Sequence, residues 1–68
     1  MEVELYCEND LIGFVDFEIV KNTNKGDYIH YSNVLYVVNI IYYTDNKINR
    51  IELEITEEEL VWTNYLEN

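Results

Sequence analysis

Hydrophobic and polar residues alternate along most of this chain, with the period of two that is typical of β-strands with one buried face. Residues 2–8 follow this pattern and predict a first strand. We expect a second strand over residues 11–20, in which Gly13 indicates a bulge or a sharp bend. A polar, asparagine-rich loop at residues 21–27 precedes a short strand at residues 28–31.

The longest hydrophobic run, residues 34–44, is apolar or aromatic on both faces. Such a strand lies centrally in a sheet or offers its second face to a partner. A last long strand is expected up to Ile55, and a slip in register near Asn49 would keep its hydrophobic residues on one face. Asparagine-containing pairs that favour tight turns separate the strands, at residues 9–10, 32–33 and 45–46.

Two structures are open for the end of the chain. Thr56 and Glu59 have the spacing of a capping box, and acidic residues in a first helical turn suit the helix dipole. A short helix over residues 57–66 would then carry an apolar stripe made of Leu60, Val61, Tyr65 and Leu66. The alternative is a last strand through residues 60–62.

These elements predict one mostly β domain over residues 1–68, a small antiparallel five-stranded sheet or barrel, with a short C-terminal helix if the tail is capped in this way. Residues 26–38 resemble small SH3-like barrels, in which a Gly-Asp pair opens a strand, a tight turn follows and an alternating strand continues into the core. The resemblance implies an SH3-like barrel fold and no particular function.

A chain of 68 residues buries a thin core, so such domains usually need extra support. Cys7 is the only cysteine, which excludes a disulfide within the chain. Cys7 and His30 are the only soft metal ligands, whereas structural zinc takes four. We therefore expect no metal and no cofactor, and dense packing or a homodimer remains as the source of support.

The chain has 14 acidic and four basic residues, a net charge of -10. Direct binding to nucleic acid is disfavoured, because phosphate contacts need Lys and Arg. The acidic surface either keeps the protein in solution or meets a basic partner. The opening residues carry acids where a secretion signal needs positive charge, and the run 34–43 is too short to span a bilayer. We expect a cytoplasmic protein without membrane contact.

Catalytic chemistry has little support in the sequence. Cys7 and His30 form the one nucleophile–base pair to consider, but Glu4, Glu8 and Asp10 surround Cys7 in the sequence and disfavour its thiolate. The two glycines stand apart, so no loop cradles a phosphate. We expect no catalytic residues and a protein that is not an enzyme.

The acidic residues of the first and last long strands point outward, and these strands are expected to be neighbours. Alternate residues on one strand lie about 6.7 Å apart, comparable with successive phosphates of a nucleic acid. Exposed aromatic residues beside carboxylates would provide contact area. The predicted partner-binding residues are Glu2, Glu4, Asp16, Glu18, Glu52, Glu54, Glu57, Glu58, Tyr36, Tyr43 and Trp62.

In size, charge and composition the chain is similar to phage-encoded counter-defence proteins, such as anti-CRISPR, anti-restriction and uracil-DNA glycosylase inhibitors. This similarity implies an inhibitor or decoy that occupies the basic, nucleic-acid-binding surface of a larger protein, in the host cytoplasm if a phage encodes it. Two alternatives are open. One is an oligomerising structural module, of virion-accessory or antitoxin type, that assembles through residues 34–43 or an open sheet edge. The other is a nucleotide-signal sponge with a tyrosine-lined dimer interface, against which the shortage of bases argues.

Overall fold

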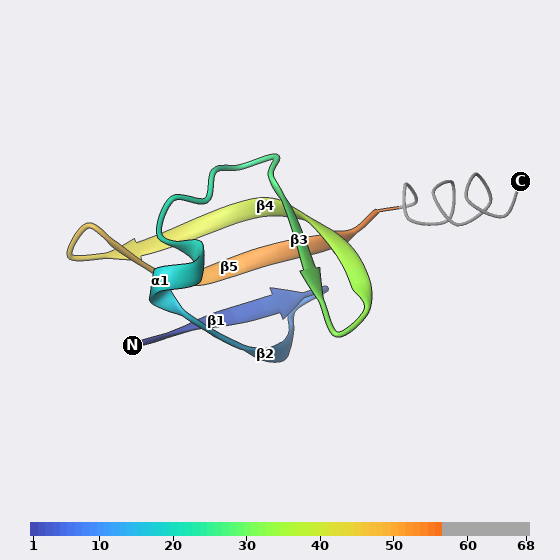
Figure 1. Cartoon of the computed structure of the whole chain (residues 1–68), viewed down its shortest axis with the longest axis horizontal. Coiled ribbons are helices and arrows are strands. Elements are labelled where there is room, and N and C mark those ends of the chain that lie inside the picture. Colours follow the sequence, from blue (N-terminus) through green and yellow to red (C-terminus); the bar gives the residue numbers. More distant parts are fainter. Residues whose placement is uncertain (57–68) are drawn as a thin grey trace, which may run out of the picture.

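A computed structural model describes residues 1–56, which form one curled, five-stranded sheet with a short helix (Figure 1). The prediction of a mostly β fold is confirmed. The predicted helix or strand in the tail lies outside the described residues. The elements are β1 (Glu2–Cys7), β2 (Asp10–Asp16), α1 (Phe17–Val20), β3 (Tyr28–Tyr31), β4 (Val34–Thr44) and β5 (Lys47–Ile55).

The strands lie in the order β2-β1-β5-β4-β3, so the first and last strands are neighbours, as predicted. The sheet was predicted to be antiparallel, but β1 runs parallel to β5 and only the other pairs are antiparallel, so the sheet is mixed. A parallel pair needs a long connection between its strands, and here the connection consists of β2, α1, β3 and β4. The sheet curls into a half-barrel whose two edges are β2 and β3.

Three hairpins turn on pairs of residues that both have positive φ. This geometry matches the right-handed twist of the flanking strands, and asparagine tolerates it well. The turns predicted at residues 32–33 and 45–46 are confirmed. The first turn was predicted at residues 9–10, but it uses Glu8 (φ 52°) and Asn9 (φ 69°), because Asp10 already pairs with Cys7 in β2.

The prediction of a single strand over residues 11–20 is wrong in its second half, because β2 ends at Asp16 and α1 follows. The Phe17 backbone N–H donates to the Met1 carbonyl oxygen at 2.8 Å, at the point where the chain leaves the sheet. The single helical turn then brings Val20 into the core at 2% exposure and leaves Ile19 75% exposed. Within residues 1–56, no helix is long and apolar enough to cross a membrane.

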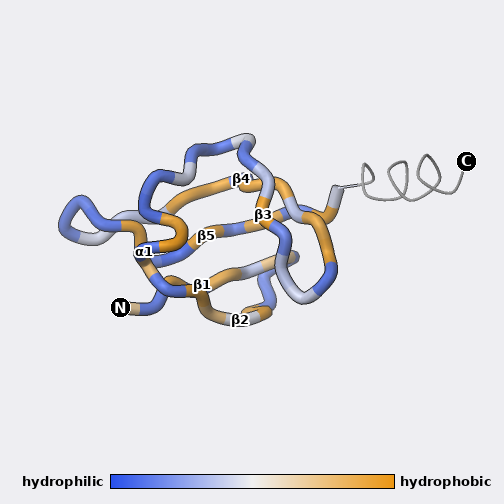
Figure 2. Tube along the Cα trace, viewed as in Figure 1, coloured by the Kyte–Doolittle hydropathy of each residue, from blue (hydrophilic) through white to orange (hydrophobic). Residues whose placement is uncertain are grey.

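The concave face of the half-barrel holds the core, and the hydrophobic colour is continuous along much of β4 but alternates along β5 (Figure 2). The predicted slip near Asn49 is confirmed, since Tyr42 faces Arg50 while Tyr43 faces Ile48. Asn49 is thus an extra residue, and hydrophobic side chains on both sides of it point inward. The core residues are Val3, Leu5, Cys7, Val20, Tyr36, Val38, Ile48, Ile51 and Leu53.

A glycine–tyrosine contact links the two edge strands across the opening of the half-barrel. A Cβ added to Gly13 on β2 would overlap the hydroxyl and ring of Tyr31 from β3. Gly13 also lies beside the predicted bulge, because Leu5 faces Gly13 and Tyr6 faces Leu11, which leaves Ile12 without a partner across the pair. A side chain therefore closes the barrel where the two strands do not pair.

Candidate functional site

The convex side of the sheet, the outer face, brings together the acidic residues of β1 and β5. Glu4 lies opposite Arg50, and Tyr6 lies opposite Glu52, in the parallel pairing of the two strands. On the other side of β5, Tyr42 of β4 faces Arg50. The predicted acidic surface therefore exists, but a basic residue lies at its centre.

Two tyrosine rings and a carboxylate hold Arg50 in place. Its guanidinium carbon lies 3.8 Å from the ring centroid of Tyr6 and 5.1 Å from that of Tyr42. Arg50 Nη2 donates to Glu52 Oε2 at 2.9 Å, and the Tyr42 hydroxyl donates to the same oxygen at 3.4 Å. Arg50 Nε is covered and has no acceptor among the described residues. The rings therefore contribute much of the stabilisation of the Arg50 guanidinium. The positive charge of Arg50 in turn offsets the negative charge of Glu52.

A second group of acids lies at the end of the β1–β2 hairpin that is farthest from its turn. Glu2 and Asp16 lie directly opposite each other, and Glu4 follows one outward position along β1. Like charges placed opposite each other destabilise a strand pair. Glu18 was predicted to join this surface, but it lies on α1 and its Oε1 accepts a hydrogen bond from Lys21 Nζ at 2.8 Å. Helix formation after Asp16 therefore removes Glu18 from the sheet face.

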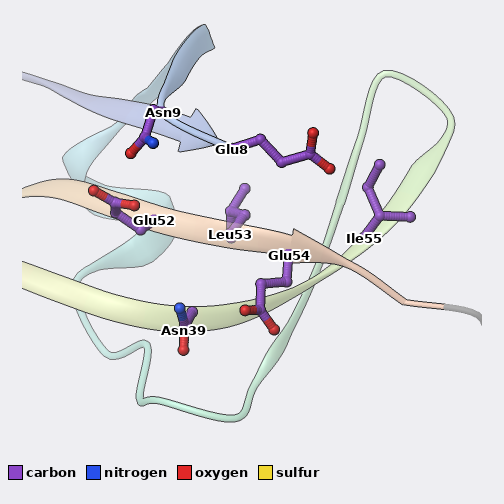
Figure 3. Close-up of a pocket in the computed structure, with 7 residues that line it drawn as sticks. All are labelled: Glu8, Asn9, Asn39, Glu52, Leu53, Glu54 and Ile55. Carbon is purple, nitrogen blue, oxygen red and sulfur yellow. The ribbon is translucent and has the colours of Figure 1, made fainter.

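A hollow of about 350 Å³ lies beyond the end of β1 (Figure 3). β1 turns away at Glu8 and Asn9, while β5 continues to Ile55, and the bulge of β4 at Asn39 borders the same space. The hollow thus combines three carboxylates, two amides and two hydrophobic residues. They are Glu8, Asn9, Asn39, Glu52, Leu53, Glu54 and Ile55.

This combination suits a long basic side chain. A lysine or arginine needs apolar surface for its methylene groups and oxygen acceptors for its charged end. The hollow provides both, and Glu8 and Glu54 are exposed, so their carboxylates are accessible. Within residues 1–56, no group of three or more His, Cys, Asp or Glu residues is placed to hold a metal ion.

The predicted aromatic contact residues have different environments. Tyr43 is 59% exposed, as a contact residue must be. Tyr36 is 8% exposed and belongs to the core, so its prediction as a surface contact is wrong. The tail residues predicted for partner binding lie outside the described residues; they are Glu57, Glu58 and Trp62.

Sequence reasoning did not assign three polar residues of the hollow to partner binding: Glu8, Asn9 and Asn39. The alternation over residues 2–8 already placed Glu8 on the outward side with Glu2, Glu4 and Tyr6, but Glu8 was not included among the predicted partner-binding residues. Asn39 had no such signal, because its position depends on the bulge between Val38 and Ile40.

Cys7 and His30 do not form a nucleophile–base pair. Cys7 is buried on the inner face of β1, whereas His30 is exposed on β3. Burial raises the pKa of the Cys7 thiol, and the charge of Glu8 raises it further, while a hydrogen bond with the Ile55 backbone opposes the shift. The thiol therefore stays neutral at physiological pH and acts as a small core residue.

No protein family matches this chain, and no curated protein or solved structure matches it either. What the outer face and the hollow can do must therefore follow from their own geometry and charge.

Proposed function

We propose that this chain is a non-enzymatic inhibitor or decoy that binds the basic, nucleic-acid-binding surface of a larger protein. The observation that carries the proposal is the hollow, in which the exposed carboxylates of Glu8 and Glu54 lie beside hydrophobic residues, while Glu52 is engaged by Arg50. One long basic side chain of the target would enter the hollow. The similarity of the chain to phage counter-defence proteins in size and charge favours the same class of target.

The four bases of this chain offset only a small part of the charge of its 14 acids. All four lie within residues 1–56, and two of them are engaged: Arg50 pairs with Glu52, and Lys21 pairs with Glu18. A preorganised surface of one charge accelerates the approach of an oppositely charged partner and competes with nucleic acid for it. The net charge of -10 therefore supports a cationic target.

Hydrophobic residues beside the carboxylates would supply contact area. Ile55 lines the hollow and is 60% exposed, and Ile40 lies opposite Glu52 with 42% exposure. Interfaces gain most of their affinity from such desolvated contacts, while charges steer and orient the partner.

The test is capture from a bacterial lysate on the immobilised chain, with elution by rising salt and identification by mass spectrometry. We expect a nucleic-acid-handling protein that is released between about 0.1 and 0.5 M salt, because the attraction is electrostatic. Added duplex DNA or RNA should displace it. Capture that is insensitive to salt, or that nucleic acid does not displace, would contradict the proposal.

Paired variants locate the contact. Glu8→Gln with Glu54→Gln removes two charges from the hollow, and we expect the affinity for the captured protein to decrease by about tenfold or more. Glu18→Gln with Asp45→Asn makes the same change of net charge elsewhere and should leave the affinity within about threefold. Equal losses of affinity in the two double variants would show that the net charge of the chain, and not the position of the carboxylates in the hollow, determines binding.

A further inference from the structure

One edge of β4 is open over the second half of the strand. β3 pairs with Val34–Val37. The next residue, Val38, is paired with the loop before β3 by two backbone hydrogen bonds: Gly26 N donates to Val38 O at 2.9 Å, and Val38 N donates to Asp27 O at 2.8 Å. Beyond Val38, nothing in the described part of the chain pairs with this edge, whereas β5 pairs with the opposite edge as far as Thr44. We call residues 40–44 the open edge.

The open edge has the composition of a strand that pairs readily. Its sequence, Ile-Ile-Tyr-Tyr-Thr, is β-branched or aromatic throughout and has no charge. Ile40, Tyr42 and Tyr43 are 42%, 41% and 59% exposed. Strand edges are usually protected by charges, bulges or short length. β2 has a bulge and begins and ends on an aspartate, and β3 has four residues, so these two edges are protected.

We propose that two copies of this chain pair through their open edges, antiparallel and about a two-fold axis, so that their sheets join into one. The open edge is bounded by Asp27 and Gly26 at one end and by the turn at residues 45–46 at the other. In an antiparallel pair of identical segments the two lengths match, and each copy provides the donors and acceptors that the other needs.

The charges that flank the open edge favour a second copy over a basic partner. Lys25 and Asp27 lie at the end next to β3, and Asp45 and Lys47 lie at the turn end. Antiparallel pairing places the β3 end of one copy beside the turn end of the other, so each end of the contact contains two lysines and two aspartates and has no net charge. A basic strand would find no carboxylate within residues 40–44.

Salt separates this pairing from target binding. Two chains with a net charge of -10 each repel one another, while residues 40–44 carry no charge and the lysines and aspartates that flank them balance. Salt screens the repulsion, so the dimer should become tighter as salt rises. The proposed target binding becomes weaker under the same change, so either inference can fail without the other.

Sedimentation equilibrium of the full chain, over a hundredfold range of concentration, tests the pairing. We expect a species of twice the chain's mass, with a dissociation constant that falls between about 0.1 and 0.5 M salt. Tyr43→Lys and Ile40→Lys, made separately, place a charge on the otherwise uncharged open edge of each copy and should raise this constant about tenfold or more. Phe14→Lys changes a residue of 47% exposure on β2 and should leave it within about threefold.

Amide hydrogen exchange of the unaltered chain gives a second measurement that does not depend on whether a variant folds. Protection within residues 40–44 should increase with protein concentration, while protection in β2 should not. A chain that is monomeric at every concentration would overturn the proposal. So would a dimer that Phe14→Lys disrupts and Tyr43→Lys does not, or exchange at residues 40–44 that is independent of concentration.

Discussion

Among single residues, Arg50 has the largest set of interactions on the outer face. Its guanidinium lies over Tyr6, near Tyr42, and bonds to Glu52, while Glu4 lies across from it on β1. The side chain is about one-third exposed, so the surrounding water screens part of the ion pair but less of the ring contacts. Arg50 therefore stabilises the pairing of two acidic strands that would otherwise repel each other.

Replacing Arg50 by methionine should destabilise the fold by about 1–2 kcal/mol at low salt, because the cation–ring contacts and the compensation of Glu4 and Glu52 are both lost. Urea unfolding followed by circular dichroism measures this. Salt at about 0.5 M should restore part of the loss by screening the two acids. Lys47→Met, at the turn end of β5, is the control and should change stability by less than about 0.5 kcal/mol. Equal effects would contradict the role of Arg50.

At the scale of elements, the contact between β2 and β3 is a packing device and not a strand pair. Tyr31 occupies the space that any side chain at position 13 would need. Because a side chain and not a backbone ladder links the two edges, the curl of the half-barrel depends on the size of residue 13.

Gly13→Ala should destabilise the fold by about 1–3 kcal/mol through overlap with Tyr31. Tyr31→Ala should remove most of this penalty in the double variant, so the two changes should be strongly non-additive. Gly26→Ala is the control. Gly26 has a φ of 94° and open space around it, so its substitution costs backbone strain and should be additive with Tyr31→Ala. Additive effects at Gly13 would show that the Tyr31 ring is not what excludes a side chain there.

Alternation and turn residues predicted β3, β4, β5 and two of the three turns, because these features are local. The end of β2 was not predictable in this way, since Phe17–Val20 fits a strand equally well and the deciding hydrogen bond comes from distant Met1. Alternation also assigned Glu2, Glu4, Glu52 and Glu54 to one face. The hollow depends on the bulge of β4 at Asn39 and on the position where β1 ends. The alternation of hydrophobic and polar residues predicts neither of these features.

For the molecule as a whole, the net charge of -10 should make stability depend on salt. Self-repulsion opposes the compact state and is relieved by screening. We expect the urea midpoint of unfolding to rise between about 0.02 and 0.5 M sodium chloride, with little further rise beyond about 1 M. An equal rise with sodium chloride and with uncharged sucrose would instead indicate a general solvent effect. A midpoint that does not change with salt would contradict a repulsive surface.

The parallel pairing of β1 with β5 sets a condition on synthesis. Glu4 faces Arg50 and Cys7 faces Leu53, so during synthesis β1 gains its central neighbour only after β5 has also been made. Until β5 is made, β1 can pair only with β2, and an isolated two-stranded hairpin has little stability in water. A chain that ends before Lys47 lacks β5, which is the central strand of the sheet. A chain shortened by premature termination should therefore stay unfolded and be degraded by proteases.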